Sequence, residues 1–155
     1  MATSNETSIE VLHVLFQQWR EEHQQLDQFI AELNAWMTQK SLHQTPDFTD
    51  AKSRLQQFEH RLREHFVKEH AMGLLLAETR GIATPEIEEL RRQADKEHGI
   101  LTVRLHDLIS GLSADANPVS AWDSAVYEFG LLLDAIEQHE EQEADRVRWL
   151  MPPIS

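Results

Sequence analysis

Residues 58–76 read FEHRLREHFVKEHAMGLLL, and this stretch decides how the chain folds. Its apolar residues recur at alternating steps of four and three, the spacing of one face of a helix in a bundle. His65 and Glu69 occupy two positions of that face, where leucine would be expected. His60 and Glu64 repeat the spacing on a polar face, so we interpret them as a solvated pair. The stretch therefore predicts a buried helix with two polar groups turned into the core.

Three other segments carry a histidine on an apolar stripe of the same kind, namely His23, His98 and His139. Glu143 follows His139 at the spacing that separates His65 from Glu69, which places both carboxylates on inward faces. With a rise of about 1.5 Å per residue, all four histidines fall into one slab near the middle of the predicted helices. Packing alone does not explain so many polar groups at one depth.

Proline, glycine and capping residues set the expected ends of four helices. The first helix begins near Thr7 and is broken by residues 39–47, and the second follows Thr45-Pro46-Asp47 and stops near Gly81. The third helix starts at Thr84-Pro85-Glu86 and ends by Gly111. The fourth starts at Pro118–Ser120, with Ser120 and Asp123 as a possible cap, and ends at Met151-Pro152-Pro153. The connections are short, so sequential helices should run antiparallel. We predict an all-α, up-down-up-down antiparallel four-helix bundle that forms a single domain over residues 1–155.

The composition excludes several functional classes. The chain has 155 residues, 27 acidic against 14 basic, and a formal net charge of −13, with no basic stripe for nucleic acid or a membrane surface. It has no cysteine, which rules out disulfides and thiolate metal sites. The first residues lack the features of a signal peptide and no apolar run reaches membrane-spanning length. We therefore expect a soluble, cytoplasmic protein that binds neither nucleic acid nor membrane.

The six inward residues have the chemistry of a metal site, and they are His23, His65, Glu69, His98, His139 and Glu143. Imidazole suits iron, zinc, copper and nickel, whereas carboxylate favours harder ions, so the mixed set indicates non-haem iron first, with manganese or zinc behind. Two facing carboxylates favour a dinuclear centre. Burying these groups without ions would cost several kcal/mol of desolvation.

Five short stretches resemble the hemerythrin-like, or HHE cation-binding, family over nearly the whole chain. They are Glu22–Ile30 (EHQQLDQFI), His65–Glu69 (HFVKE), Lys96–His98 (KEH), His139–Glu143 (HEEQE) and Leu150–Pro152 (LMP). The resemblance implies two non-haem iron ions, Fe2+ or Fe3+, joined by an oxo or hydroxo bridge. It also implies that Glu69 and Glu143 bridge the ions, with His23 and His65 on one ion and His98 and His139 on the other.

Two departures from the oxygen-carrying members of that family bear on function. Thr102 stands where those members have a second histidine in the third helix, and Glu143 comes four residues after His139 where they have an aspartate after five. The pattern is instead similar to the bacterial H-HxxxE-H-HxxxE type. One imidazole fewer leaves room for water or a hydrogen-bonded group such as Thr102, which weighs against simple reversible oxygen carriage.

Three functions remain open at this point. The first is a diiron protein that binds dioxygen, peroxide or nitric oxide, with or without turnover, so that enzymatic activity is undecided. The second is an iron-sensing, redox-sensing or iron-storing module. The third is a metal-free helical interaction module. The sequence names no protein partner.

Overall fold

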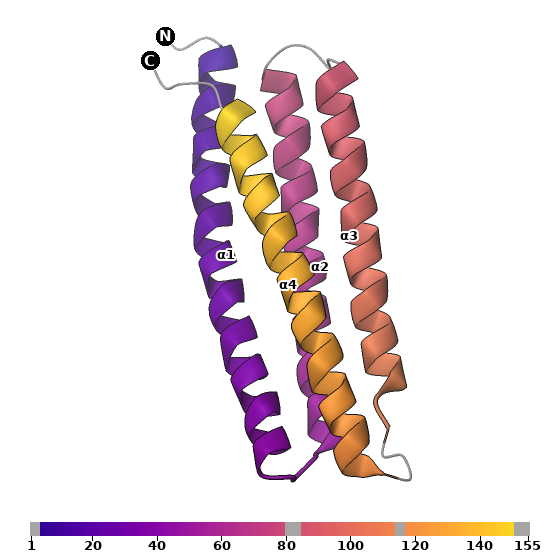
Figure 1. Cartoon of the computed structure of the whole chain (residues 1–155). Helices are drawn as coiled ribbons and strands as arrows, with labels where there is room; N and C mark the ends of the chain where they lie inside the picture. The colour runs from indigo at the N-terminus through magenta and orange to yellow at the C-terminus, as the bar shows by residue number, and fades with distance from the viewer. Residues whose placement is uncertain (1–3, 80–84, 114–116, 151–155) are drawn as a thin grey trace.

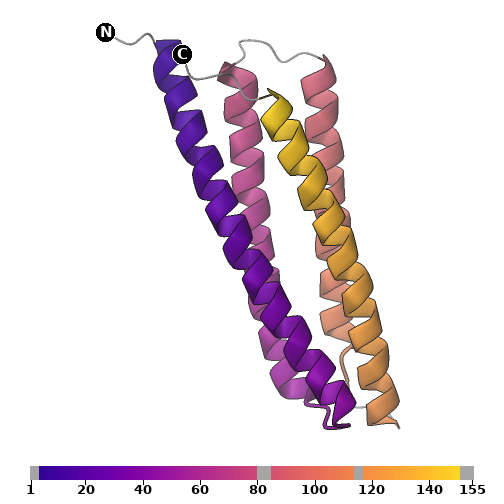
Figure 2. The ribbon, with the colours of Figure 1, turned by 60° about the vertical axis from the view of Figure 1, so that its left-hand side comes forward.

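The computed structural model describes residues 4–79, 85–113 and 117–150, which form four long helices (Figure 1). They are α1 (Ser4–Leu42), α2 (Phe48–Thr79), α3 (Pro85–Gly111) and α4 (Pro118–Leu150). Successive helices run in opposite directions, and the start of α1 lies at the same end of the bundle as the end of α4 (Figures 1 and 2). The prediction of an all-α four-helix bundle is confirmed.

Helix neighbours follow the order of the chain. α1 packs on α2, α2 on α3, α3 on α4, and α4 returns to α1, so that a ring of four helices encloses one interior. Each helix contributes one apolar stripe to that interior, as the alternating spacing of three and four requires. Within the described residues, no helix is both long enough and apolar enough to cross a membrane.

The start of α1 differs from the predicted one, whereas α2 and α4 start where the sequence indicated, each with its own cap. α1 begins at Ser4, so Thr7 lies inside the helix. α2 begins after Asp47, whose side-chain oxygen accepts a hydrogen bond from the Asp50 amide at 3.0 Å. α4 is capped by Asn117, which accepts from the Ser120 amide at 3.1 Å. Aspartate and asparagine are both favoured N-cap residues, and Pro118 takes the first helical position of α4.

Other predicted boundaries fare differently. α3 begins at Pro85 and ends at Gly111, as the proline and the glycine indicate. Asp123, expected to help cap α4, instead accepts a hydrogen bond from the hydroxyl of Ser41. The predicted stop at Gly81, the cap at Thr84 and the end at 151–153 lie outside the described residues.

The apolar core is divided into two parts. The larger part fills the end of the bundle that holds the α1–α2 turn, with Leu33, Leu55, Phe58 and Phe129 among its fully or nearly fully buried residues. A smaller part fills the opposite end and, among the residues that the structure describes, consists of Leu12, Trp19, Met72, Leu76 and Val147. Buried histidines and glutamates occupy the level between them. The fold therefore sets a polar layer inside an otherwise apolar interior.

Candidate metal centre

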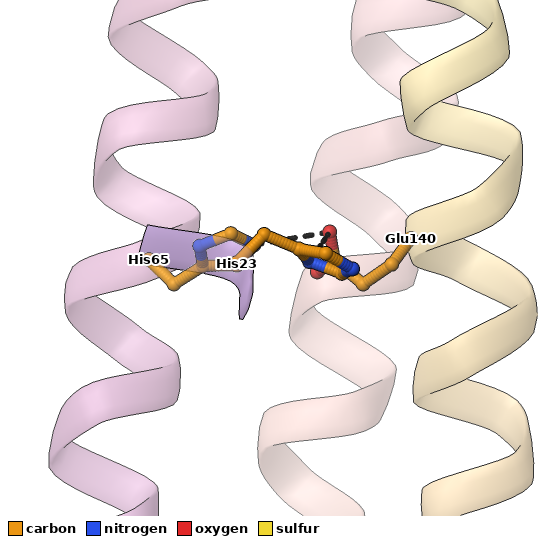
Figure 3. Close-up of side chains that lie close together, drawn as sticks. All are labelled: His23, His65 and Glu140. Carbon is orange, nitrogen blue, oxygen red and sulfur yellow. Dashed lines mark ion pairs between the residues drawn. The ribbon is translucent and has the colours of Figure 1, made fainter. Parts of the chain in front are cut away.

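The first group of the polar layer joins three helices. His23 of α1, His65 of α2 and Glu140 of α4 bring their ligand atoms within 4.8 Å of one another. Glu140 Oε2 lies 3.5 Å from His23 Nδ1 and 3.0 Å from His65 Nε2. Figure 3 shows the carboxylate reaching across the bundle to both imidazoles. His65 and Glu140 are buried, and the His23 side chain keeps 26% exposure.

The second group consists of Glu69 from α2, His98 from α3 and His139 from α4, all buried. Glu69 Oε2 lies 2.7 Å from His98 Nε2 and 3.4 Å from His139 Nε2. The three ligand atoms again lie within 4.8 Å of one another. One carboxylate and two imidazoles thus converge on a point between three helices.

Glu69 connects the two groups. Its Oε1 lies 2.8 Å from His65 Nε2, in the first group, while its Oε2 contacts the second group. The spacing of His65 and Glu69 by one helical turn places both side chains on the same face of α2. A carboxylate whose two oxygens face different sets of imidazoles has the geometry needed to bridge two cations.

Several polar atoms of the first group are buried without a hydrogen-bond partner among the described residues. Both ring nitrogens of His65, Nδ1 of His23 and both carboxylate oxygens of Glu140 lack a hydrogen bond of good geometry within the described part of the chain. Buried polar atoms are rarely left in this state, because each loses its water without replacement. Imidazole nitrogens and carboxylate oxygens are good ligands for iron, so the residues fit a bound cation.

Electrostatics favour positive charge in the layer. Burial alone would lower the pKa of His65, but the carboxylates of Glu140 and Glu69 raise it to about 10. Burial likewise opposes protonation of His139, whose pKa the Glu69 and Glu97 carboxylates raise to about 9. Burial would raise the pKa of Glu69, yet contacts with His139, His65 and His98 hold it well below its usual range. Metal cations can take the place of these protons, so binding should release protons.

Aromatic rings hold the ligands in place from both sides. Trp19 stacks on His23 and His65, and its indole Nε1 donates a hydrogen bond to Glu69 Oε1 at 3.3 Å. Phe66 stacks on His98 with ring centroids 4.0 Å apart. Glu97 lies 2.5 Å from Nδ1 of His139 and so fixes which nitrogen of that ring faces Glu69.

Five of the six predicted residues meet in these groups, and the sixth lies apart. Glu143 lies on the α4 face that lines a cavity beside Glu69 and His98. Its burial and the repulsion from Glu69 raise its pKa to about 7. The hydroxyl of Thr102, which we considered as a possible ligand, donates to the backbone carbonyl of His98 and is thereby occupied.

Glu140 was missed by the sequence reasoning. The predicted apolar stripe of α4 passes from Ile136 to His139, a step of three residues. A step of four residues from Ile136 leads to Glu140 instead. Both steps belong to one helical face, and at this level α4 contacts helices on two sides. A carboxylate at the alternative position was the available signal.

Comparison with known proteins agrees with this geometry. The family model described as "Hemerythrin HHE cation binding domain" matches residues 14–147, which include every residue of both groups. No curated protein and no solved structure matches the chain significantly.

Proposed function

The chain belongs to the hemerythrin HHE cation-binding family, and on that premise we propose that it holds two non-haem iron ions in the polar layer and binds a small ligand there. Membership of the family implies iron binding, and the His/Glu groups provide possible ligands. Dioxygen, peroxide and nitric oxide are the ligands we propose. All are small enough to reach an enclosed site between helices.

In the proposed arrangement each group holds one ion. His23, His65 and Glu140 serve the first ion, and His98 and His139 serve the second. Glu69 would serve both ions, because one of its oxygens contacts His65 and the other contacts His98. Glu143 supplies a further carboxylate to the second ion from the cavity side, because it lines the same cavity as His98. This assignment keeps all six sequence-predicted residues and adds Glu140.

One observation carries the proposal, namely the position of Glu69. Its carboxylate is almost completely buried and lies within 3.4 Å of imidazole nitrogens from three helices. A structural ion pair would need only one imidazole partner. Burying the charged Glu69 carboxylate among several imidazoles would cost free energy unless cations compensate its negative charge. A bridging ligand needs this arrangement.

Bound iron would supply open coordination positions and electrons for the small ligand. The protein's own side chains would orient the ligands and exclude water. Trp19 fixes one oxygen of Glu69, and Phe66 and Trp19 cover His98 and His65. Leu62, Leu101 and Ile136 of the larger core lie on the other side of the layer and keep it dry.

The test is iron content per chain, measured on protein from iron-supplemented cells, together with absorption spectra of the reduced form before and after dioxygen, peroxide or nitric oxide. We expect close to two irons in the wild-type protein, one for each group. Glu69→Gln should lose most of both ions, because it weakens the bridge. Glu64→Gln is the matched control, since Glu64 forms an exposed pair with His60 on the same helix.

The outcomes separate the candidate functions. Full iron in wild type and Glu64→Gln, loss in Glu69→Gln, and spectral changes with a small ligand support the proposal. Full iron without any spectral change would favour an iron-storing or iron-sensing module instead. Absence of iron from the wild-type protein would overturn the diiron centre altogether.

A further inference from the structure

A cavity of about 50 Å³ lies beside the second group, between the last turns of α2, the first turns of α3 and the last turns of α4. Glu69 and His98 form part of its wall, so it opens directly on the candidate second ion. Its volume is that of a few water molecules. Gly73 leaves room on the α2 side, where an added Cβ would meet only the Arg91 side chain, at 4.0 Å.

Two arginines line this cavity, and both bring a buried donor that nothing satisfies. Arg91 Nε and Arg146 Nη1 have no hydrogen-bond partner among the residues that the structure describes. Glu143 Oε2 is 3.6 Å from Arg146 Nη1, close enough for charge attraction but too far for a hydrogen bond. Guanidinium groups retain their charge at all ordinary pH values, so these donors require an acceptor.

Glu143 of the cavity wall is the ion-pair partner of Arg146, and the other carboxylates and the imidazoles of the wall have partners of their own. His70 and Asp95 pair with each other at 3.2 Å. Glu69 contacts three imidazoles of the polar layer. Arg91 Nε and Arg146 Nη1 therefore each remain able to donate a hydrogen bond to something that enters, and they lie on different helices, α3 and α4.

We propose that Arg91 and Arg146 form a subsite for a small inorganic oxyanion next to the second ion. The anion would accept hydrogen bonds from Arg91 Nε and Arg146 Nη1 on the side of the cavity that His98 lines. Planar guanidinium groups match oxygen pairs of this kind. The volume limits the ligand to about four heavy atoms. The position of this subsite beside an iron ion rests on the proposed function, whereas the binding of an anion by the two arginines does not.

Nitrite is a suitable probe, because it has three heavy atoms and two oxygen acceptors. Its affinity is measured by titration calorimetry in chloride-free buffer, on iron-loaded and chelator-treated protein. The double variant Arg91→Gln/Arg146→Gln should bind nitrite at least about tenfold more weakly, since it loses charge-assisted hydrogen bonds. Each single variant should give an intermediate loss, which keeps the test valid if the double variant does not fold.

The matched control is Arg92→Gln/Arg148→Gln. It removes the same charge from the same two helices, but both residues are exposed and lie outside the cavity. We expect its nitrite affinity to stay within about twofold of wild type, because solvent and salt screen charges at this distance. Any general attraction of anions to the protein would affect both double variants alike.

Three results would overturn the subsite. The first is wild-type protein that binds no nitrite, which would mean that the cavity holds only water. The second is an equal loss of nitrite affinity in both double variants, and the third is no loss of affinity in either. Iron content is determined on the same samples and reports separately on the diiron centre. Arginine-dependent nitrite binding by protein that takes up no iron even from iron-supplemented cells would support the subsite while refuting the proposed function.

Discussion

Glu140 and Glu143 lie about one turn apart on α4, and their surroundings differ sharply. Glu140 is 3% exposed and faces His23 and His65. Glu143 lies nearer the cavity, where Arg146 is its ion-pair partner at 3.6 Å. Neither environment follows from the residue type. It follows from which neighbouring helix each position of α4 meets, so two glutamates three residues apart can have different roles.

Glu143 makes the stability of the iron-free protein depend on pH. Burial and the Glu69 charge raise its pKa to about 7, from an ordinary value of 4.5. Between these values the folded state holds a proton that the unfolded state has lost, so stability should fall as pH rises from 4.5 to 7. The shift corresponds to roughly 3 kcal/mol at most. Glu143→Gln cannot ionise and should therefore gain stability relative to wild type as pH rises.

Urea unfolding of chelator-treated protein at pH 5 and pH 8 measures this effect. The variant should be the more stable protein at pH 8, by about 2–3 kcal/mol, and the difference should shrink at pH 5. Glu141→Gln, an exposed change of equal charge on the same helix, controls for net charge. A difference between Glu143→Gln and wild type that is the same at both pH values would contradict the assignment.

The sequence identified the histidines of the layer more reliably than its carboxylates. An imidazole on a leucine stripe stands out, as His65 and His139 do. Glutamate is common on every face of a soluble helix, so Glu140 gave no such contrast beside Glu141. The spatial pairing of Trp19 with Glu69, fifty residues apart in the chain, could not be read from any local pattern.

At the scale of elements, the turn from α1 to α2 shows how one backbone conformation ends a helix. Gln44 has a φ of 52°, the left-handed region. Its amide donates to Ser41 O at 3.1 Å, and the Thr45 amide donates to Lys40 O at 3.0 Å. These two bonds are those of a Schellman motif, in which glycine is the preferred residue at the left-handed position.

Gln44→Gly should therefore stabilise the protein by about 1 kcal/mol, because a side chain is disfavoured at positive φ. Chemical denaturation in urea measures the change. Gln39→Gly is the control, since Gln39 is exposed but lies within α1, where glycine should cost about 0.5–1 kcal/mol. Destabilisation by both changes would show that the turn does not impose the conformation seen here.

Helix ends were predictable where proline and glycine set them. They were less predictable where more than one nearby side chain is able to cap the helix N-terminus. Pro85 and Gly111 bound α3 as expected. Asp47 caps α2, and Asn117 caps α4 although Ser120 also has a side chain able to cap a helix. The sequence shows which residues are able to cap, whereas the packing of each helix against its neighbours decides which residue does.

At the scale of the whole molecule, the polar layer separates two apolar cores of unequal size. Of the side chains that the structure describes, the larger core holds most of the buried hydrophobic ones and the smaller holds five. The alternating stripes predicted that the four histidines share one level of the bundle. They did not predict the division of the core into two parts, since that division depends on how all four helices meet.

Iron should stabilise the molecule, and most strongly at its smaller core. Ions present at a free concentration about a thousandfold above their dissociation constant add about 4 kcal/mol to the free energy of unfolding. This raises the melting temperature of a chain of this size by roughly 10 °C. Chelator-treated protein should melt lower by that amount. Its amide hydrogens around Leu12, Met72 and Val147 should also exchange faster than those around Leu55 and Phe129, because few apolar contacts hold the smaller core.

Hydrogen exchange followed by mass spectrometry, with and without iron, resolves the two ends of the bundle. Adding iron should slow exchange chiefly on the side of Leu12 and Met72, since the ions join all four helices where the smaller core begins. Glu69→Gln should show fast exchange there under both conditions. Equal exchange at both ends, or a melting temperature that chelation leaves unchanged, would mean that the polar layer holds the helices together without metal.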